Sequence, residues 1–122
     1  MGKKILVVDD DPDIASLLQS TLEYAGYEIR LYEGGEDVLV CLNEYKPDLL
    51  ITDVMLPGID GYSLVTLLAD DEILRNLPVI ILSALTPSRN MFGNIPQVKA
   101  FLPKPFKAED LAAAVKSALA GK

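Results

Sequence analysis

The sequence contains no histidine, a single cysteine and no long uninterrupted apolar segment. The absence of histidine excludes a phosphohistidine carrier and a kinase's own phosphoacceptor. Cys41 cannot form a disulfide within the chain, and its place in a helical pattern predicts a small buried apolar residue. Because no apolar stretch reaches the ~18 residues of a membrane span and no signal peptide is recognisable, we expect a cytoplasmic protein without membrane insertion.

Basic residues are also scarce. The chain has 11 lysines and arginines against 18 aspartates and glutamates, a formal net charge of −7. Neutralising the phosphates of a nucleic acid requires an excess of basic side chains, so we expect no direct nucleic-acid binding. A length of 122 residues suits one domain with a substantial core, and residues 1–122 are predicted to form a single domain.

Short apolar runs alternate with helical patterns along the chain. The runs cover residues 5–8, 28–31, 49–52, 79–82 and 100–102. Between and after them, apolar residues recur with a helical period over 14–25, 38–45, 64–68 and 111–119. This alternation predicts an α/β fold, in which right-handed crossovers build a parallel sheet with helices on both faces.

Acidic residues follow two of the runs: Asp9 and Asp10 the first, and Asp53 the third. In a flavodoxin-like, doubly wound sheet of order 2-1-3-4-5, the first and third strands are neighbours and a crevice opens at their carboxyl ends. Two unit charges ~4 Å apart repel by roughly 4 kcal/mol at an effective dielectric near 20. Three such carboxylates must therefore protonate, separate or bind a cation, and their oxygen atoms suit Mg²⁺.

A neighbouring acid has a structural explanation. Asp11 precedes Pro12, and this pair predicts the N-cap and the first residue of a helix. Gly26 follows the same helical pattern and predicts its end. Pro47 and Pro78 each precede an apolar run and are typical of a boundary before a strand.

Four segments together resemble a known family. ILVVDDDPDI, DLLITDVMLPGIDG, VIILSA and FLPKPF stand in the order and spacing of the receiver domain of two-component response regulators, and the chain is similar to the single-domain chemotaxis type. The resemblance extends from Lys4 to about Leu119. It implies a five-stranded flavodoxin-like sheet and a switch operated by phosphorylation.

The resemblance also implies roles for the acids. Asp53 would accept the phosphoryl group. Asp9 and Asp10 would hold Mg²⁺, with Mn²⁺ as an alternative ion. Asp10 and Asp53 would bind the ion directly, and the backbone carbonyl of Met55 would complete the protein ligands.

Three further residues match positions of the family's switch. Lys104 would pair with Asp53 and then with the phosphoryl group, and Ser83 would donate its hydroxyl to a phosphoryl oxygen. Phe101 would turn inward when Ser83 moves. Taken without the resemblance, Ser83 could end a strand, Phe101 could belong to the core and Lys104 could be an exposed cation.

The sequence departs from the family between Ser83 and Lys104. The family has a fourth helix there, but Gly93 and Pro96 interrupt this segment and no sustained helical period is present. Thr86 and Pro87 could begin a helix of a turn or two. We therefore expect a short or irregular fourth helix.

The resulting hypothesis is a receiver that takes a phosphoryl group from a sensor histidine kinase or a phosphotransfer protein and then binds a downstream protein. It would catalyse its own phosphorylation and dephosphorylation without being an enzyme for another substrate. The chain ends soon after its last helical pattern, so no output domain is expected. We expect a monomer or a phosphorylation-dependent dimer.

Three other classes of protein are alternatives. A Mg²⁺-dependent phosphohydrolase of the haloacid dehalogenase type would need an acid where the chain has Met55. A flavodoxin would need a phosphate-binding loop after the first strand, where the acids 9–11 would repel a phosphate. A receiver-shaped interaction module that is never phosphorylated would not need the set Asp9, Asp10, Asp53, Ser83 and Lys104.

Overall fold

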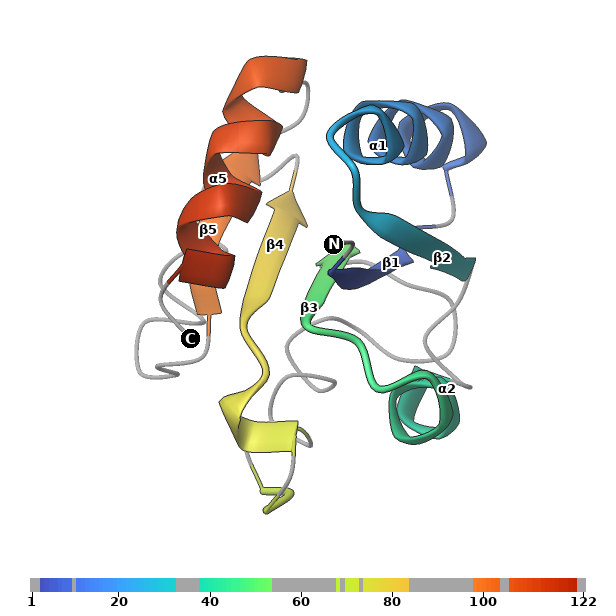
Figure 1. Ribbon diagram of the computed structural model, residues 1–122, viewed down its shortest axis with the longest axis vertical. Coiled ribbons are helices and arrows are strands. Elements are labelled where there is room, and N and C mark those ends of the chain that lie inside the picture. The colour runs from blue at the N-terminus through green and yellow to red at the C-terminus, as the bar shows by residue number, and fades with distance from the viewer. Residues whose placement is uncertain are drawn as a thin grey trace.

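The computed structural model shows one parallel sheet with helices on both faces (Figure 1). The structure describes residues 3–9, 11–32, 38–53, 68, 70–72, 74–83, 98–103 and 106–120. The strands are β1 (Lys4–Val8), β2 (Glu28–Tyr32), β3 (Leu49–Asp53), β4 (Val79–Ser83) and β5 (Val98–Pro103). The helices are α1 (Pro12–Tyr24), α2 (Val38–Tyr45), the 3₁₀ turn η1 (Leu74–Asn76) and α5 (Ala108–Ala120).

The strand order is β2-β1-β3-β4-β5, and every pairing is parallel. This confirms the predicted doubly wound, flavodoxin-like topology. Every strand extends further than its apolar run, and Asp53 and Ser83 are the last residues of β3 and β4. The polar residues of interest thus lie in the sheet at its carboxyl edge.

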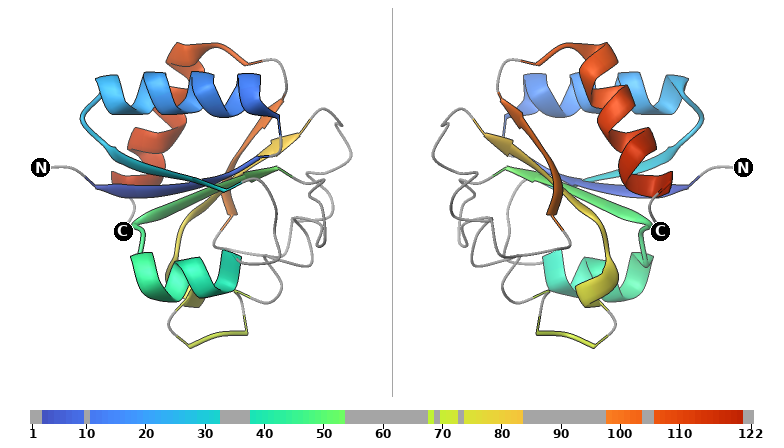
Figure 2. Two further views of the ribbon diagram at one scale, coloured as in Figure 1. Left: turned by 90° about the vertical axis from the view of Figure 1, so that its right-hand side faces the viewer. Right: turned by 90° about the vertical axis from the view of Figure 1, so that its left-hand side faces the viewer.

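Each face of the sheet has its own hydrophobic core. Helices α1 and α5 cover one face, and α2 covers the other (Figure 2). Side chains alternate along each strand, so Ile5 and Val7 of β1 pack under α1 and α5, while Leu6 and Val8 pack on the α2 side. The whole of β3 is buried, whereas the edge strand β2 leaves Leu31 37% exposed.

Helix α1 begins and ends as its sequence predicts. Asp11 is the N-cap, and its side chain accepts hydrogen bonds from the backbone N–H groups of Asp13 and Ile14, with Pro12 as the first helical residue. Gly26 follows the helix with φ +99°, a conformation that glycine adopts without strain. These residues fix where the chain leaves β1 and where it enters β2.

Several expectations fall outside the described residues. The predicted third helix is represented only by Leu68, a buried helical residue. The segment 84–97, where a short or irregular fourth helix was predicted, is not among the described residues. Within the part of the chain that is described, no helix combines the length and the apolar character needed to cross a membrane.

Candidate functional site

The carboxyl edge of the sheet brings Asp9 and Asp53 together. The last paired residues of β1 and β3 are Val8 and Thr52, so the next residue on each strand occupies the same row. Asp9 continues the series of Val7, and Asp53 continues that of Ile51, both on the α1 and α5 side of the sheet. Because neighbouring strands lie about 4.8 Å apart, the two carboxylates come from adjacent points of the backbone.

Asp9 is held firmly at this edge. It is 2% exposed, its backbone N–H donates to the carbonyl of Tyr32 (3.0 Å), and its Oδ1 accepts from the backbone N–H of Asp11 (2.9 Å). Asp11 in turn caps α1. Asp9 therefore joins the end of β1 to the start of α1 as well as lining the edge.

This structural role of Asp9 was not part of the sequence interpretation, which assigned it only to a cation. The signal was present, because aspartate often accepts a hydrogen bond from the backbone two residues later. This hydrogen bond holds Oδ1 of Asp9 in place. Asp9 therefore has a structural role as well as its predicted role in binding a cation.

Asp53 occupies the middle of the edge. It is 9% exposed and pairs with Leu82 of β4. The hydroxyl of buried Thr52 donates to the backbone carbonyl of Asp53 (3.1 Å). The backbone of Asp53 is therefore held from within β3 and by β4.

The register also aligns the positions of the other predicted residues. Ser83 stands opposite Pro103, one row beyond the pair of Leu82 and Leu102, and Lys104 is the next residue of the chain after Pro103. The backbones of Ser83 and Phe101 are described, but their side chains are not. Asp10, Met55 and Lys104 lie outside the described residues.

Two buried carboxylates in one row repel each other. At a separation of about 5 Å and an effective dielectric near 20, the repulsion is roughly 3 kcal/mol. A divalent cation would relieve it, and carboxylate oxygens are the ligands that Mg²⁺ prefers. Asp9 and Asp53 thus fit a magnesium site, although the described residues alone contain no group of three or more potential metal ligands.

The prediction for Cys41 is confirmed. Its thiol is free and buried in the core on the α2 face. A hydrogen bond between Tyr32 and Cys41 raises the pKa of the tyrosine hydroxyl. Tyr32 of β2 packs against the same core, so the cysteine is a packing residue between α2 and the sheet.

A protein family and several curated proteins match this chain over almost its whole length. Residues 5–116 match the response regulator receiver domain. The chain is 36% identical over 121 residues to the phosphate regulon transcriptional regulatory protein PhoB of Pseudomonas aeruginosa, with 98% of this chain and 52% of that protein covered. The chain spans about half the length of the curated relatives it matches.

Solved structures give the same result. A putative response regulator from Chloroflexus aurantiacus has a TM-score of 0.92 and 34% identity, covering 98% of this chain and 99% of that one. The receiver domain of the sensor histidine kinase PA1611 from Pseudomonas aeruginosa has a TM-score of 0.85 and 28% identity, covering 98% and 99%. That structure has a magnesium ion coordinated in its active site cleft.

Proposed function

Because this chain belongs to the response regulator receiver family, we propose that Asp53 is its phosphoacceptor and that the carboxyl edge of its sheet is the phosphorylation site. The observation that carries this proposal is the position of Asp53, which is buried at the end of β3 and in one row with Asp9. Asp9 is therefore a second acid beside Asp53. Two neighbouring acids can hold the metal ion that assists phosphoryl transfer.

In the proposed reaction, a carboxylate oxygen of Asp53 attacks the phosphorus atom of the donor. The new bond joins phosphorus to that oxygen, and the bond from phosphorus to the donor's histidine nitrogen breaks with its electron pair on the nitrogen. In a small donor such as acetyl phosphate, the bond to the acyl oxygen breaks instead. The product is an aspartyl phosphate on β3.

Mg²⁺, or Mn²⁺ in its place, would neutralise charge on the phosphoryl oxygens. Asp9, Asp10, Asp53 and the carbonyl of Met55 would hold the ion. The hydrogen bond from the backbone of Asp11 fixes Oδ1 of Asp9, so that the acid is positioned before the donor arrives. Positioning and charge neutralisation are the main contributions a protein makes to phosphoryl transfer.

Two strands beyond β3 would complete the site. Ser83 ends β4 beside the acceptor strand and would donate its hydroxyl to a phosphoryl oxygen. Lys104 follows β5 and would pair with the carboxylate of Asp53, then with the phosphoryl group. Phe101, within β5, would change its position with Ser83 and alter the surface that a partner recognises.

The proposed activity is a signalling cycle rather than catalysis on an external substrate. The site would accelerate both its own phosphorylation and the hydrolysis of the aspartyl phosphate. The phosphoryl group would come from a sensor histidine kinase or a phosphotransfer protein in the cytoplasm. The phosphorylated form would bind a downstream protein, as a monomer or a phosphorylation-dependent dimer, without contacting nucleic acid directly.

Intact mass spectrometry after incubation with acetyl phosphate and Mg²⁺ tests the proposal. We expect the mass to rise by one phosphoryl group, and we expect Asp53→Asn or EDTA to prevent the rise. Asp70→Asn, which neutralises an exposed acid away from the edge, is the control and should be phosphorylated normally. A single phosphoryl group retained by Asp53→Asn would contradict the assignment.

The substitution Asp9→Asn distinguishes the structural role of Asp9 from its proposed role in binding the ion. An asparagine can still accept the hydrogen bond from the backbone of Asp11, but it no longer carries the charge that would attract the ion. We therefore expect a folded protein that needs a higher Mg²⁺ concentration for phosphorylation. Release of inorganic phosphate from added phosphomonoesters, with no phosphorylated protein detected, would favour the phosphohydrolase.

A further inference from the structure

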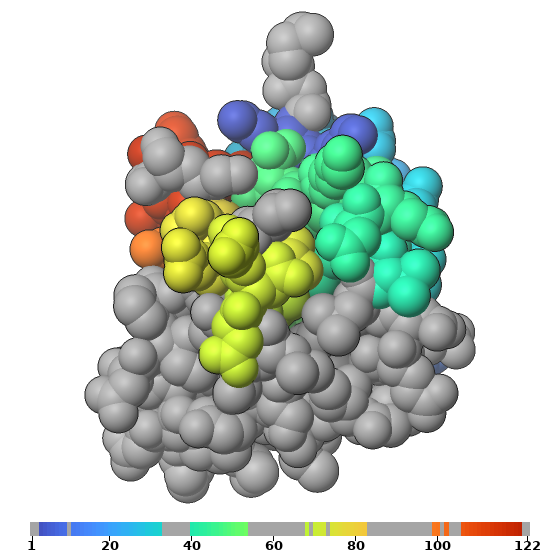
Figure 3. All heavy atoms as spheres, turned by 90° about the horizontal axis from the view of Figure 1, so that it is seen from below, coloured from blue at the N-terminus to red at the C-terminus, as the bar shows by residue number. Residues whose placement is uncertain are grey.

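A pocket of about 350 Å³ lies at the edge of the sheet opposite the phosphorylation site. Its lining comes from the end of α2, from the two residues that follow α2 and from η1 with the residue that follows it: Leu42, Asn43, Lys46, Pro47, Leu74, Asn76 and Leu77. Figure 3 shows this side of the molecule, with the green residues of α2 and the yellow residues before β4 side by side.

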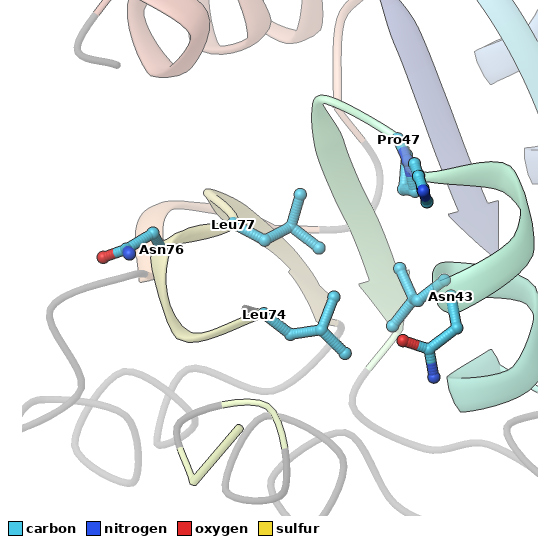
Figure 4. A pocket seen from close by; sticks show the side chains of 7 residues that line it. Asn43, Pro47, Leu74, Asn76 and Leu77 are labelled. Atoms are coloured by element: carbon cyan, nitrogen blue, oxygen red, sulfur yellow. The ribbon is translucent and has the colours of Figure 1, made fainter. Parts of the chain in front are cut away.

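The pocket has an apolar floor and a polar rim. Leu42, Leu74, Leu77 and Pro47 are buried, and in Figure 4 Leu74 and Leu77 extend toward Asn43 and Pro47 from the opposite side. The rim residues Asn43, Lys46 and Asn76 are exposed, and the side chain of Asn76 points away from the leucines. This combination of apolar walls with a few polar groups is typical of small-molecule sites.

The charge of the lining is opposite to that of the chain. The chain has a formal net charge of −7, whereas the lining residues within the described part of the chain include Lys46 and no acid. A ligand that enters this pocket therefore meets a local positive charge beside the apolar floor. An anionic group on the ligand would complement Lys46.

The backbone conformation of Lys46 is a second, independent feature of the pocket. It has φ 54°, in the left-handed region that favours glycine, directly after the last residue of α2. A lysine pays a conformational penalty at this point of the chain that a glycine would avoid. The exposed side chain of Lys46 therefore starts from a strained point of the backbone beside the pocket.

We propose that this pocket binds a small amphipathic carboxylic acid, with its apolar body against the leucines and its carboxylate beside Lys46. The volume is at the lower end of the range for small-molecule pockets, roughly 300–1,000 Å³. It lies about 15 Å from Asp53, at the other end of the five residues of β3.

The test is a titration of the unphosphorylated, ¹⁵N-labelled chain with 4-phenylbutyrate and with its neutral analogue 4-phenylbutanamide, followed by two-dimensional NMR. We expect the backbone amide signals of Asn43, Leu74 and Leu77 to shift with both compounds. The acid should bind about two- to fivefold more tightly, the range of one exposed ion pair. Absence of shifts at these residues, or equal affinity for both compounds, would overturn the proposal.

Two substitutions of Lys46 separate the effect of its charge on ligand binding from the effect of its backbone conformation on stability. Lys46→Ala and Lys46→Gly both remove the charge, but only glycine relieves the backbone strain. Both should reduce the affinity for the acid to that for the amide, while the melting temperature rises only in Lys46→Gly. Arg75→Ala, at an exposed cation of η1 outside the lining, should leave both affinities unchanged.

Two further experiments test whether the acid occupies this pocket or a second copy of the chain does. One fills the pocket by substitution, and the other varies the protein concentration. Asn43→Phe should abolish the shifts with both compounds, because the larger side chain enters the space between α2 and η1. Shifts of the same signals with protein concentration in the absence of ligand would assign the pocket to a second copy of the chain and overturn the proposal. Retention of the acid preference in both Lys46 variants would overturn it as well.

Discussion

The two ends of the sheet differ in the charges of their neighbouring side chains. At the carboxyl end, Asp9 and Asp53 lie in one row, so like charges are neighbours. At the amino end, Tyr45 of α2 donates a hydrogen bond to the carboxylate of Glu28 (2.8 Å), and its ring contacts two cations. The carboxyl end of the sheet therefore brings two acids together, whereas the amino end joins an acid to a tyrosine that two cations contact.

The amino end is stabilised by several small contributions. The guanidinium carbon of Arg30 is 4.3 Å from the centre of the Tyr45 ring, and the ammonium of Lys4 is 5.3 Å from it. The backbone N–H of Lys4 donates to Asp48 (2.9 Å). Each such contact is worth about 0.5–1 kcal/mol, and together they fix α2 against β1 and β2.

The proposed active site and the stabilising contacts of Tyr45 lie at opposite ends of the sheet. Removing a charge from the carboxyl end should stabilise the fold, whereas removing a partner from the amino end should destabilise it. The predictions below test this difference in sign.

The largest expected effect is that of Asp53→Asn in the absence of divalent ions. It removes one of two adjacent carboxylates and also the proposed ion pair with Lys104, so we expect a net rise in the free energy of unfolding of about 2 kcal/mol. Urea denaturation with EDTA present measures it, and Asp70→Asn is the control at an exposed position. A decrease in stability would show that the edge is not under electrostatic tension.

The second effect is that of Mg²⁺ on the wild-type chain. An ion that binds only the folded state stabilises it by about 1.4 kcal/mol at ten times its dissociation constant. We expect a higher melting temperature with MgCl₂, and a smaller shift in Asp53→Asn and Asp9→Asn. NaCl at equal ionic strength is the control, since general screening would act on all three proteins alike.

The third effect is at the amino end, where Tyr45→Phe removes the hydrogen bond to Glu28. We expect a loss of about 1 kcal/mol at neutral pH, measured by urea denaturation. Tyr24→Phe is the matched control, because Tyr24 is 95% exposed. Equal stability of the two variants would mean that the hydrogen bond from Tyr45 to Glu28 contributes nothing to stability.

The same tyrosine predicts a dependence on pH. Burial, and then the hydrogen bond to Glu28, raises the pKa of Tyr45. The folded state therefore favours the neutral phenol, and this contribution to stability is complete below the ordinary tyrosine pKa of about 10 and decreases as the pH rises above it. Tyr45→Phe should lose less stability than the wild type over that alkaline range.

The smallest effect is that of Lys46→Gly, which relieves a positive φ of 54° and should raise the free energy of unfolding by about 1 kcal/mol or less. Lys46→Ala is the control, because alanine keeps the strain while removing the charge. If both variants were equally stabilised, the gain would come from charge and not from the backbone.

Much of the fold could be predicted from the sequence. The alternation of strand and helix patterns and the four family motifs led to the order β2-β1-β3-β4-β5, and that order is what places Asp9 beside Asp53. The N-cap at Asp11 was equally predictable, because capping depends on residues close together in the chain.

Features that depend on packing between distant segments were not predicted. The contacts of Tyr45 with Glu28 and Arg30 require the position of α2 over β2, which no local pattern specifies. The left-handed backbone at Lys46 was unexpected because glycine is the usual residue there. The roles of Asp10, Met55 and Lys104 still rest on the family motifs.

The pairing of β1 with β3 has a consequence for the newly made protein. Asp9 and Asp53 become neighbours only after the chain has completed the crossover through α1, β2 and α2. Pairing of segments so distant in sequence is a slow step in folding. A chain that is incompletely folded would therefore lack the proposed phosphorylation site, and a phosphoryl donor could modify only molecules that have finished folding.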